Sequence, residues 1–318
     1  MTLSQRHVMR ALMAGLASAF AFMALFSGNV FGLSIGLLSP LPLFVTAMIS
    51  GLTGTALATL LAFGLLALQA DALLSVGVFL MGIAGPPLYL AWRMDMRHRD
   101  PSSPRRLTGR AIGNHLAIMA LAGGALMGLS LLQLDKAMVE TGGLTGYAQR
   151  SIDAATDAMA AGGGMSNSSV IAMKAQANAL GARLFVVAGA MWLLLMVMNA
   201  GIAGRLAKQM PSFEKAHMRM VQLPRWFVFP VAAFTILSLS SGIPGVAIAV
   251  LAITLLTAAA IQGLSVIHYA SHTLRHRGAF LFGVYALCFF FNPAGILLAL
   301  MGLADSRLDL RQRFAGGQ

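Results

Sequence analysis

The sequence predicts an all-α protein, a polytopic transmembrane helical bundle of 8–9 spans with several spans broken by proline or glycine. Hydrophobic residues make up 58% of the 318 residues and charged residues 10%, against about 25% charged in an ordinary soluble domain. Mean hydropathy is +0.79. Apolar runs longer than about 18 residues recur, as a bilayer about 30 Å thick requires. A soluble enzyme, a disordered chain and a disulfide scaffold are therefore excluded.

Backbone groups within lipid must be hydrogen-bonded internally, and the runs lack the alternation of barrel strands, so we expect helices. The first run follows Arg6 and Arg10, as a signal peptide would, but no convincing small-x-small cleavage site follows it before the next apolar run, and we interpret it as an uncleaved span. The candidate spans are Ala11–Ser27, Val30–Ser50, Leu52–Ala70, Leu73–Trp92, Ala111–Leu132, Arg183–Ala203, Trp226–Ser241, Gly245–Tyr269 and Ala279–Leu303.

Lys and Arg are divided unequally between the two sides that these spans define. The N-terminus, the 93–110 loop, the 205–225 connector and the connector after the eighth span together hold fifteen, and the opposite side holds four. The positive-inside rule makes the richer side cytoplasmic. We therefore expect an inner-membrane protein with a cytoplasmic N-terminus. This orientation explains the net charge of +12, because most of the basic residues lie on the cytoplasmic side. No nucleic-acid partner is needed to explain the charge.

The C-terminal tail has two possible locations. After nine crossings Arg307, Arg311 and Arg313 would lie outside, which the rule disfavours. Asn292-Pro293 divides the last run into two pieces that are each too short to cross. A re-entrant hairpin that returns the tail to the cytoplasm is therefore the alternative, and the sequence leaves both open.

We expect one integral membrane domain over residues 1–318. Its outer loop, residues 133–182, is rich in Ala, Gly and Ser. Two short helices are predicted in this loop, Tyr147–Ala161 and one from Ser168 that runs straight into the sixth span. A solvated or interfacial hairpin is favoured over a lid. The four parts of the domain are a four-span unit 11–92, a cytoplasmic basic loop 93–110, spans 111–303 with the outer loop 133–182, and a polar tail 304–318.

Proline and glycine interrupt the second, fourth and last spans. Each proline frees a helix carbonyl, which is tolerated at membrane depth only where protein or a water-filled cavity satisfies it. Broken helices therefore indicate a binding cavity, with ordinary kinks as the alternative. Polar side chains inside the spans, such as Asn114, Asn199 and Gln262, suit either a neutral ligand or helix-to-helix bonding, and we favour the bonding. The candidate cavity residues are Pro40, Pro42, Pro86, Pro87, Gln262, Tyr285 and Asn292.

Two further patterns favour structure over chemistry. His268, His272 and His276 recur every four residues, which predicts that they share one helical face at the cytoplasmic end of the eighth span and makes them a weak metal candidate. Interfacial anchoring is favoured, and no metal or cofactor is expected. The stretch from Gly32 to Gly36 matches a nucleophile elbow, but it lies in a glycine-spaced apolar run that is typical of helix packing. No catalytic residue is expected, and we interpret the chain as a non-enzyme.

The acidic residues restrict the mechanism further. All ten lie in loops or at the ends of the predicted spans, which disfavours a proton-coupled pump. The chain contains no GxxxxGK[ST] loop, so it does not hydrolyse ATP by itself.

Several short motifs carry a family resemblance. They are Pro40-Leu41-Pro42, Pro224-Arg225-Trp226, the run from Gln262 to His268, Gly302-Leu303-Ala304-Asp305 and Leu308-Asp309-Leu310-Arg311. Together they resemble the YybS-like family of uncharacterised bacterial multi-pass membrane proteins. That family is distantly similar to the substrate-binding components of energy-coupling-factor transporters, which bind a micronutrient and dock on a separate transmembrane and ATPase module. The spacing of Ala17 and Ala21 is similar to their docking motif, whereas the number of spans exceeds their usual six.

The sequence therefore predicts a small-solute, vitamin-like binding or transport component without its own ATPase. Its expected partners are the lipid bilayer and, by the resemblance, a separate transmembrane and ATPase module. The alternative is a membrane scaffold or assembly protein that recruits a partner or anionic lipid through its basic cytoplasmic loops, 93–110 and 205–225.

Overall fold

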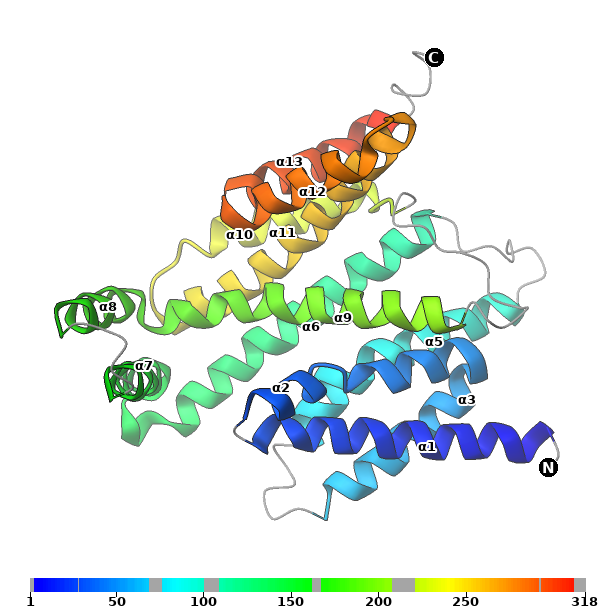
Figure 1. The fold of residues 1–318 in the computed structure, drawn as a ribbon, viewed down its shortest axis with the longest axis horizontal. Coiled ribbons are helices and arrows are strands. Elements are labelled where there is room, and N and C mark those ends of the chain that lie inside the picture. The colour runs from blue at the N-terminus through cyan, green and yellow to red at the C-terminus, as the bar shows by residue number, and fades with distance from the viewer. Residues whose placement is uncertain are drawn as a thin grey trace.

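The computed structural model describes residues 3–27, 29–68, 76–99, 109–161, 167–207, 221–291 and 293–311, and it has no strand within these ranges. Long helices lie side by side in a bundle, and a shorter hairpin stands at one end (Figure 1). The elements are α1 (Leu3–Ala24), η1 (Leu25–Ser27), α2 (Val30–Gly36), α3 (Pro40–Leu66), η2 (Phe79–Ala84), α5 (Gly85–Arg99), α6 (Gly109–Ala137), η3 (Val139–Thr141), α7 (Gly143–Ala161), α8 (Asn167–Leu180), η4 (Gly181–Phe185), α9 (Val186–Ala207), η6 (Arg225–Phe227), α10 (Val228–Leu237), α11 (Gly242–Ala270), η7 (Ser271–Thr273), α12 (Arg277–Phe290) and α13 (Pro293–Leu308).

Within the described residues, five helical segments are long and apolar enough to cross a membrane, or six if α12 and α13 count as one bent span. The predicted number of 8–9 is not confirmed. The predicted second and third spans fall within one segment, the fourth gives an α5 of 15 residues, and the seventh gives an α10 of 10 residues. The five segments are His7–Ser27, Val30–Leu66, Gly109–Ala137, Gly181–Ala207 and Gly242–Ala270.

Helix α3 is interrupted at Gly51, at the boundary between the predicted second and third spans. Gly51 has φ 65° and ψ −157°, a conformation that is open almost only to glycine. Figure 1 shows α3 changing direction along its length. Helix α3 therefore consists of two segments that run in different directions.

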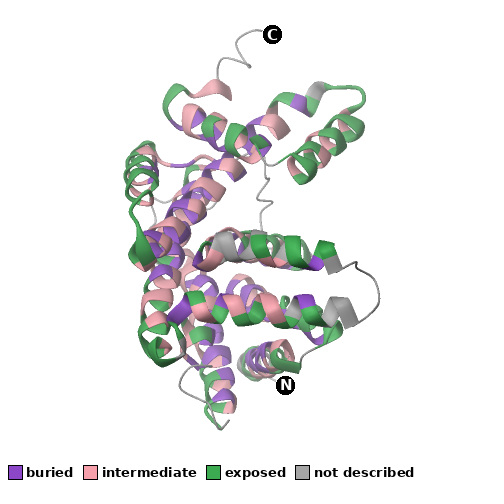
Figure 2. Ribbon diagram, turned by 90° about the vertical axis from the view of Figure 1, so that its left-hand side faces the viewer, coloured by how far each residue is buried: buried purple, intermediate pink, exposed green. Residues whose placement is uncertain are grey.

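Two clusters of buried apolar side chains form the core. The first joins α1, α3, η2 and α9, and the second joins α6, α9, α10, α11, α13 and the segment before α10. Trp192 of α9 packs against both clusters, so α9 connects the two halves of the bundle. Figure 2 shows the buried residues following the inner faces of the long helices, whereas α12 has none.

Helix α11 lies at the centre of the C-terminal half and packs against α6, α9, α10 and α13. Its contact with α13 is close because glycines lie on both sides. A Cβ built on Gly302 would lie 1.9 Å from the carbonyl oxygen of Ala259, and one built on Gly263 would lie 2.0 Å from that of Leu298. Small residues permit such close backbone approach in membrane helices.

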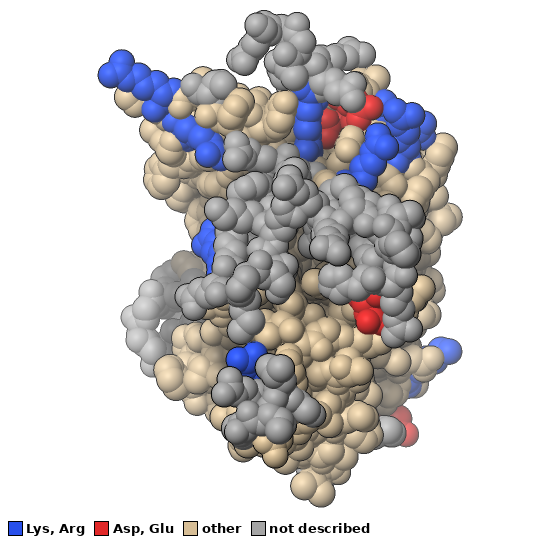
Figure 3. Space-filling model, turned by 90° about the vertical axis from the view of Figure 1, so that its right-hand side faces the viewer, with Lys and Arg blue, Asp and Glu red and all other residues tan. Residues whose placement is uncertain are grey.

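The basic side chains gather at one end of the bundle, which we call the basic end. It holds the start of α1, the end of α5, the start of α6, and the ends of α9 and α11 (Figure 1). Figure 3 looks onto this side of the molecule and shows Lys and Arg gathered towards its top. By their places in these elements, Arg110 lies at the start of α6, Arg205 in the last turn of α9 and Arg225 at the start of η6. Lys136 lies in the last turn of α6, and Arg150, Lys174 and Arg183 belong to α7, α8 and η4, which stand at the opposite end (Figure 1).

The helices α12 and α13 form a hairpin, which bears on the two locations predicted for the tail. The chain bends by 118° between them. Asp305 of α13 is bonded to Gln262 of α11, and Arg311 to Ser265, so the end of α13 lies beside the C-terminal part of α11. Such a bent pair is either a broken span or a re-entrant loop, and its packing places the end of α13, with Arg307 and Arg311, beside the end of α11.

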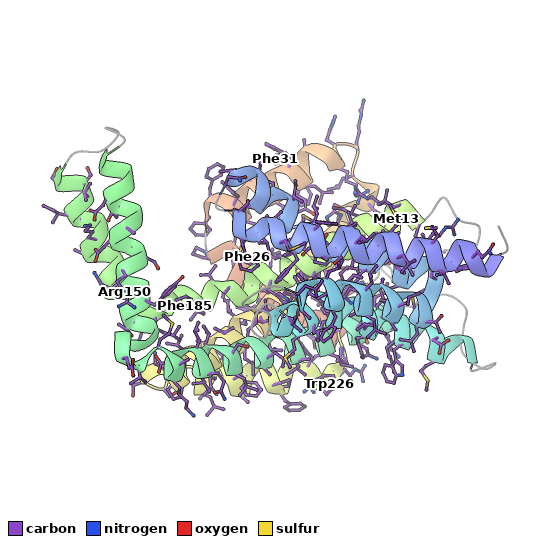
Figure 4. The ribbon with its side chains drawn as sticks, turned by 90° about the horizontal axis from the view of Figure 1, so that it is seen from below. Met13, Phe26, Phe31, Arg150, Phe185 and Trp226 are labelled. Carbon is purple, nitrogen blue, oxygen red and sulfur yellow. The ribbon has the colours of Figure 1, made fainter. Side chains whose placement is uncertain are left out.

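The predicted outer loop forms two helices, α7 and α8, close to the predicted positions. The second does not run straight into α9, because η4 begins at Gly181 with φ 48°. Figure 4 shows this hairpin standing away from the bundle, with Arg150 on its side and Phe185 at its base, whereas Met13, Phe26 and Phe31 lie on the outer surface of the bundle. The hairpin and the basic end are at opposite ends of the molecule (Figure 1).

Candidate functional site

A non-helical strap, residues 221–224, crosses the basic end between the ends of three helices. The Gln222 amide donates to the carbonyl of Gly109 at the start of α6, 3.1 Å away. Gly113 of α6 has the strap backbone directly against it, since a Cβ there would lie 1.8 Å from the Gln222 oxygen. Pro224 then leads into η6 and α10. The strap is thus held against α6 by its backbone.

A buried polar network fixes the inner side of the strap. Gln262 of α11, fully buried, accepts the Leu223 amide hydrogen at 2.6 Å and donates from Nε2 to Asp305 Oδ2 at 2.8 Å. One amide side chain therefore joins the strap, α11 and α13. Because Oε1 and Nε2 of Gln262 are both bonded to other parts of the protein, this side chain has a structural role. This agrees with the predicted bonding between helices.

Arg311 completes this network from the C-terminal side. Its guanidinium lies 3.2 Å from Asp305 Oδ2, and it donates to the Val221 carbonyl at 2.5 Å and to Ser265 Oγ at 3.2 Å. The Asp305 side chain is 1% exposed and that of Arg311 14%. Burial removes water from this carboxylate, so the nearby guanidinium must compensate for the lost hydration of its charge. Asp305 was predicted to lie at the end of a span, and it does lie near the end of α13, but inside the packed protein.

A pocket of about 350 Å³ opens on the outer side of the strap. Arg110 and Asn114 of α6 form one wall, the strap and Arg225 form another, and the end of α13 contributes the rest. Leu223, 2% exposed, and Pro224 form its apolar part. The lining residues are Arg110, Asn114, Gln222, Leu223, Pro224, Arg225, Ser306 and Asp309. The network beneath the strap therefore holds one wall of this pocket in place.

The charges around the pocket are unevenly matched. Asp309 accepts a hydrogen bond from Gln222 Nε2 at 2.8 Å and lies 3.3 Å from the Arg225 guanidinium, so this carboxylate is engaged on both oxygens. Arg110 is exposed and makes no ion pair within the described part of the chain. The pocket thus presents two cations and one carboxylate, together with the amide of Asn114.

The predicted break at Pro40 and Pro42 is confirmed, since α2 ends at Gly36 and α3 begins at Pro40. The Leu41 amide donates to Leu38 instead of Leu37. Asn199 Nδ2 of α9 donates to the freed Leu37 carbonyl at 3.0 Å, and Ser18 Oγ of α1 donates to that of Ser39 at 2.7 Å. Protein side chains therefore satisfy this break.

The predicted break at Pro86 and Pro87 is also confirmed, as the π-helical turn η2, which leads into α5. The Gly82 carbonyl would be bonded by residue 86 in an α-helix or residue 87 in a π-helix, and proline has no N–H to give. Trp192 Nε1 of α9 donates to it instead, at 2.8 Å. A second discontinuity is thus closed by a side chain of α9.

The third break also falls where it was predicted, since α12 ends at Phe290 and α13 begins at Pro293. Asn292 itself lies outside the described residues. Tyr285 is half-exposed on α12 and bonds His268 Nε2 at 2.9 Å, so it joins α12 to α11. None of Pro40, Pro42, Pro86, Pro87, Gln262 and Tyr285 lines the pocket at the strap.

The three histidines do not share a helical face, because α11 ends at Ala270 between the first and the second. His268 contacts Tyr285 and Arg277, whereas His272 approaches the Tyr269 carbonyl. In the part of the chain that the structure describes, no three His, Cys, Asp or Glu residues are placed to hold a metal ion.

The strap site brings together motifs that are far apart in the sequence. Arg225, Asp305, Asp309 and Arg311 belong to the motifs that carry the family resemblance, and Asn114 is among the polar side chains noted inside the spans. The sequence reasoning missed Gln222 and Ser306. The proline after Gln222 was the available signal, because Pro224 requires an extended or turn conformation just before it.

Comparison with known proteins gives one result. The family model described as "Predicted membrane protein (DUF2232)" matches residues 117–306, which include most of the C-terminal half of the bundle. No curated protein and no solved structure matches the chain.

Proposed function

The chain belongs to this DUF2232 family of predicted membrane proteins, and we propose that it is a membrane-embedded component that binds a small solute in the pocket at the strap. The proposal is a binding function and includes no reaction. The observation that carries it is the pocket itself, a concave site of about 350 Å³ with polar side chains from α6, from the strap with Arg225, and from the end of α13. This volume is within the range of small-molecule sites.

Preorganisation supports binding at this place. The wall formed by the strap is held by the Gln262 amide, the Arg311 guanidinium and the backbone of α6. Groups fixed before a ligand arrives lose little conformational entropy on binding. The breaks at Pro40 and Pro86 offer no comparable site, because side chains from other helices occupy their free carbonyls.

In this proposal the protein lies in the inner membrane of the cell. The positive-inside rule then orients the basic end towards the cytoplasm. In this topology the first eight predicted spans cross the bilayer, the second and third as the two segments of α3, and α12 and α13 form a re-entrant hairpin. The fourth and seventh of these spans, which give α5 and α10, are shorter than the five long segments. The pocket lies at the basic end and is therefore cytoplasmic. The sequence has no nucleotide-binding loop, so any energy-driven transport needs a separate ATPase module.

Ligand-dependent thermal unfolding in a mild detergent tests the proposal. A panel of vitamin-like and other small solutes is added to the purified protein, and a co-purifying molecule is sought by mass spectrometry. A true ligand raises the Tm of the wild type and raises that of Asn114→Ala less. Arg205→Gln, an exposed arginine at the same end, is the matched control and keeps the full shift. A panel without any shift, and no co-purifying molecule, would contradict the proposal.

A scaffold function is the second candidate, and the gathering of cations at one end favours it (Figure 3). Each basic residue near an anionic membrane surface is worth about 1 kcal/mol of attraction. Most of the two basic loops, residues 100–108 and 208–220, lies outside the described residues. Crosslinking in membranes distinguishes the two functions, because a partner captured through these loops and lost on charge reversal favours the scaffold.

A further inference from the structure

We infer that the ligand of the strap pocket carries a phosphoryl group and that Arg110 and Asn114 are the side chains that bind it. The inference rests on the proposed function and adds the chemical class of the ligand. The group could belong to a phosphorylated solute or to the headgroup of an anionic lipid. The same chemistry serves both, and the experiment below separates them.

The position of Arg110 is the first argument. Arg110 and Asn114 are one helical turn apart on α6, so they lie on the same face of the helix, and both line the pocket. The Arg110 guanidinium makes no ion pair among the described residues, and its exposure leaves it accessible. Of the two cations in the lining, Arg110 is therefore the one that no described carboxylate neutralises.

The second argument is that the carboxylate of the pocket, Asp309, is already paired with a cation, Arg225. Asp309 takes a hydrogen bond from Gln222 and an ion pair from Arg225. These contacts keep the carboxylate beside the strap and hold Arg225 at the rim of the pocket. An anion that binds at Arg110 therefore meets a site with net positive charge, and the Arg225 guanidinium is a second cation within the same lining.

The direction of the donors is the third argument. Arg110 and Asn114 offer N–H groups from α6, whereas Arg225 offers them from a different element, η6, directly after the strap. A carboxylate has two oxygens in one plane and is matched by a single guanidinium. A phosphoryl group has oxygens pointing in several directions and accepts from donors on different walls. The pocket, at about 350 Å³, holds such a group with a small substituent.

The probes for the experiment are inorganic phosphate and phosphatidylglycerol, each added to protein in dodecyl maltoside, with phosphate-free buffer as the reference. Thermal unfolding is followed by the fluorescence of the three tryptophans. We expect one probe to raise the Tm of the wild type, and the apparent affinity to fall about tenfold or more in Arg110→Gln and severalfold in Asn114→Ala. Arg205→Gln is expected to bind as the wild type does.

The outcomes identify the source of the group. A shift with inorganic phosphate supports a phosphorylated solute, and a shift with phosphatidylglycerol alone supports a lipid headgroup. The inference is overturned if neither probe shifts the Tm, or if Arg110→Gln responds as the wild type does. An uncharged solute from the wider panel that binds in the wild type, and less well in Asn114→Ala, would overturn the phosphoryl class while leaving the proposed binding function intact.

Discussion

In the N-terminal half of the bundle, the two breaks at prolines are closed by neutral side chains from neighbouring helices, whereas the C-terminal half buries a charged pair. Asn199 and Trp192 of α9 satisfy the carbonyls freed near Pro40 and Pro86. In the C-terminal half, Asp305 and Arg311 are joined through Gln262 to a strap that forms one wall of an open pocket. The comparison teaches that an interrupted helix need not mark a binding site. Better evidence of a binding site is a set of exposed polar groups beside a segment that the protein holds rigidly, as it holds the strap.

Loss of the buried charge pair should have the largest effect. Arg311→Gln leaves the Asp305 carboxylate, 1% exposed, without its cation, and breaking such a pair costs about 3–5 kcal/mol. We expect the free energy of unfolding in mixed micelles to fall by this order. The double variant Asp305→Asn with Arg311→Gln should recover part of the loss, because it buries no charge. Arg307→Gln, which removes an arginine over the Phe229 ring, is the control.

If Arg311→Gln unfolds no more easily than Arg307→Gln, the charge pair does not support the strap, and the contrast between the two halves fails at its strongest point.

The close contact between α11 and α13 should show the next effect. Gly302→Ala places a methyl group against the Ala259 carbonyl, at 1.9 Å before relaxation, and overpacking of this kind costs about 1–3 kcal/mol. Gly295, on the same helix, has nothing within 4 Å of a Cβ. Gly295→Ala should therefore be neutral or slightly stabilising by helix propensity. Equal effects of the two substitutions on the free energy of unfolding would contradict the packing of α13 on α11.

The closure of a break in the N-terminal half should matter less. Asn199→Leu keeps the approximate size of the side chain but leaves the Leu37 carbonyl without its donor. An unsatisfied buried acceptor costs about 1–3 kcal/mol, and we expect the lower part of that range because only one neutral group is affected. The measurement is thermal unfolding in detergent. A larger loss than for Arg311→Gln would reverse the comparison between the halves.

The outer hairpin should give the smallest effect. Lys174 of α8 bonds Asp157 of α7 at 2.8 Å on the surface, and this hydrogen bond raises the pKa of Lys174 above its usual 10.5. The pair therefore contributes below the pKa of the unfolded chain, and its contribution is lost as the pH rises through the raised value. Lys174→Gln should leave the Tm at neutral pH unchanged within error. A clear drop in Tm would show that the hairpin is part of the core.

Local patterns predicted much of the fold. The three interrupted helices, the two helices of the outer loop and the gathering of cations at one end each follow from a few adjacent residues, since proline, glycine and charge act over short distances. The number of crossings was harder to predict, because residues 76–99 combine a π-helical turn with a charged end, and the two predicted spans within α3 are separated only by the kink at Gly51.

The site could be predicted only in part, because the groups that decide it come from distant parts of the chain. Trp192 lies 110 residues from Gly82, and Asn199 lies 162 residues from Leu37. No local pattern shows that these side chains fill the positions where a cavity was expected. Likewise, Arg311 reaches Val221 across 90 residues. The motifs of the family resemblance named several members of this site, but only the packing of α13 on α11 brings them together.

Thiol labelling at the pocket tests the central claim most directly. Cys288 is the single cysteine, so Cys288→Ala gives a background for Asn114→Cys in the pocket and Ser39→Cys at a buried position of the N-terminal half. The account predicts that a membrane-impermeant maleimide labels residue 114 in inside-out vesicles, that ligand or phosphate slows this labelling, and that residue 39 stays unlabelled. Labelling of residue 114 from the outer side alone, or at a rate that no ligand changes, would contradict the account.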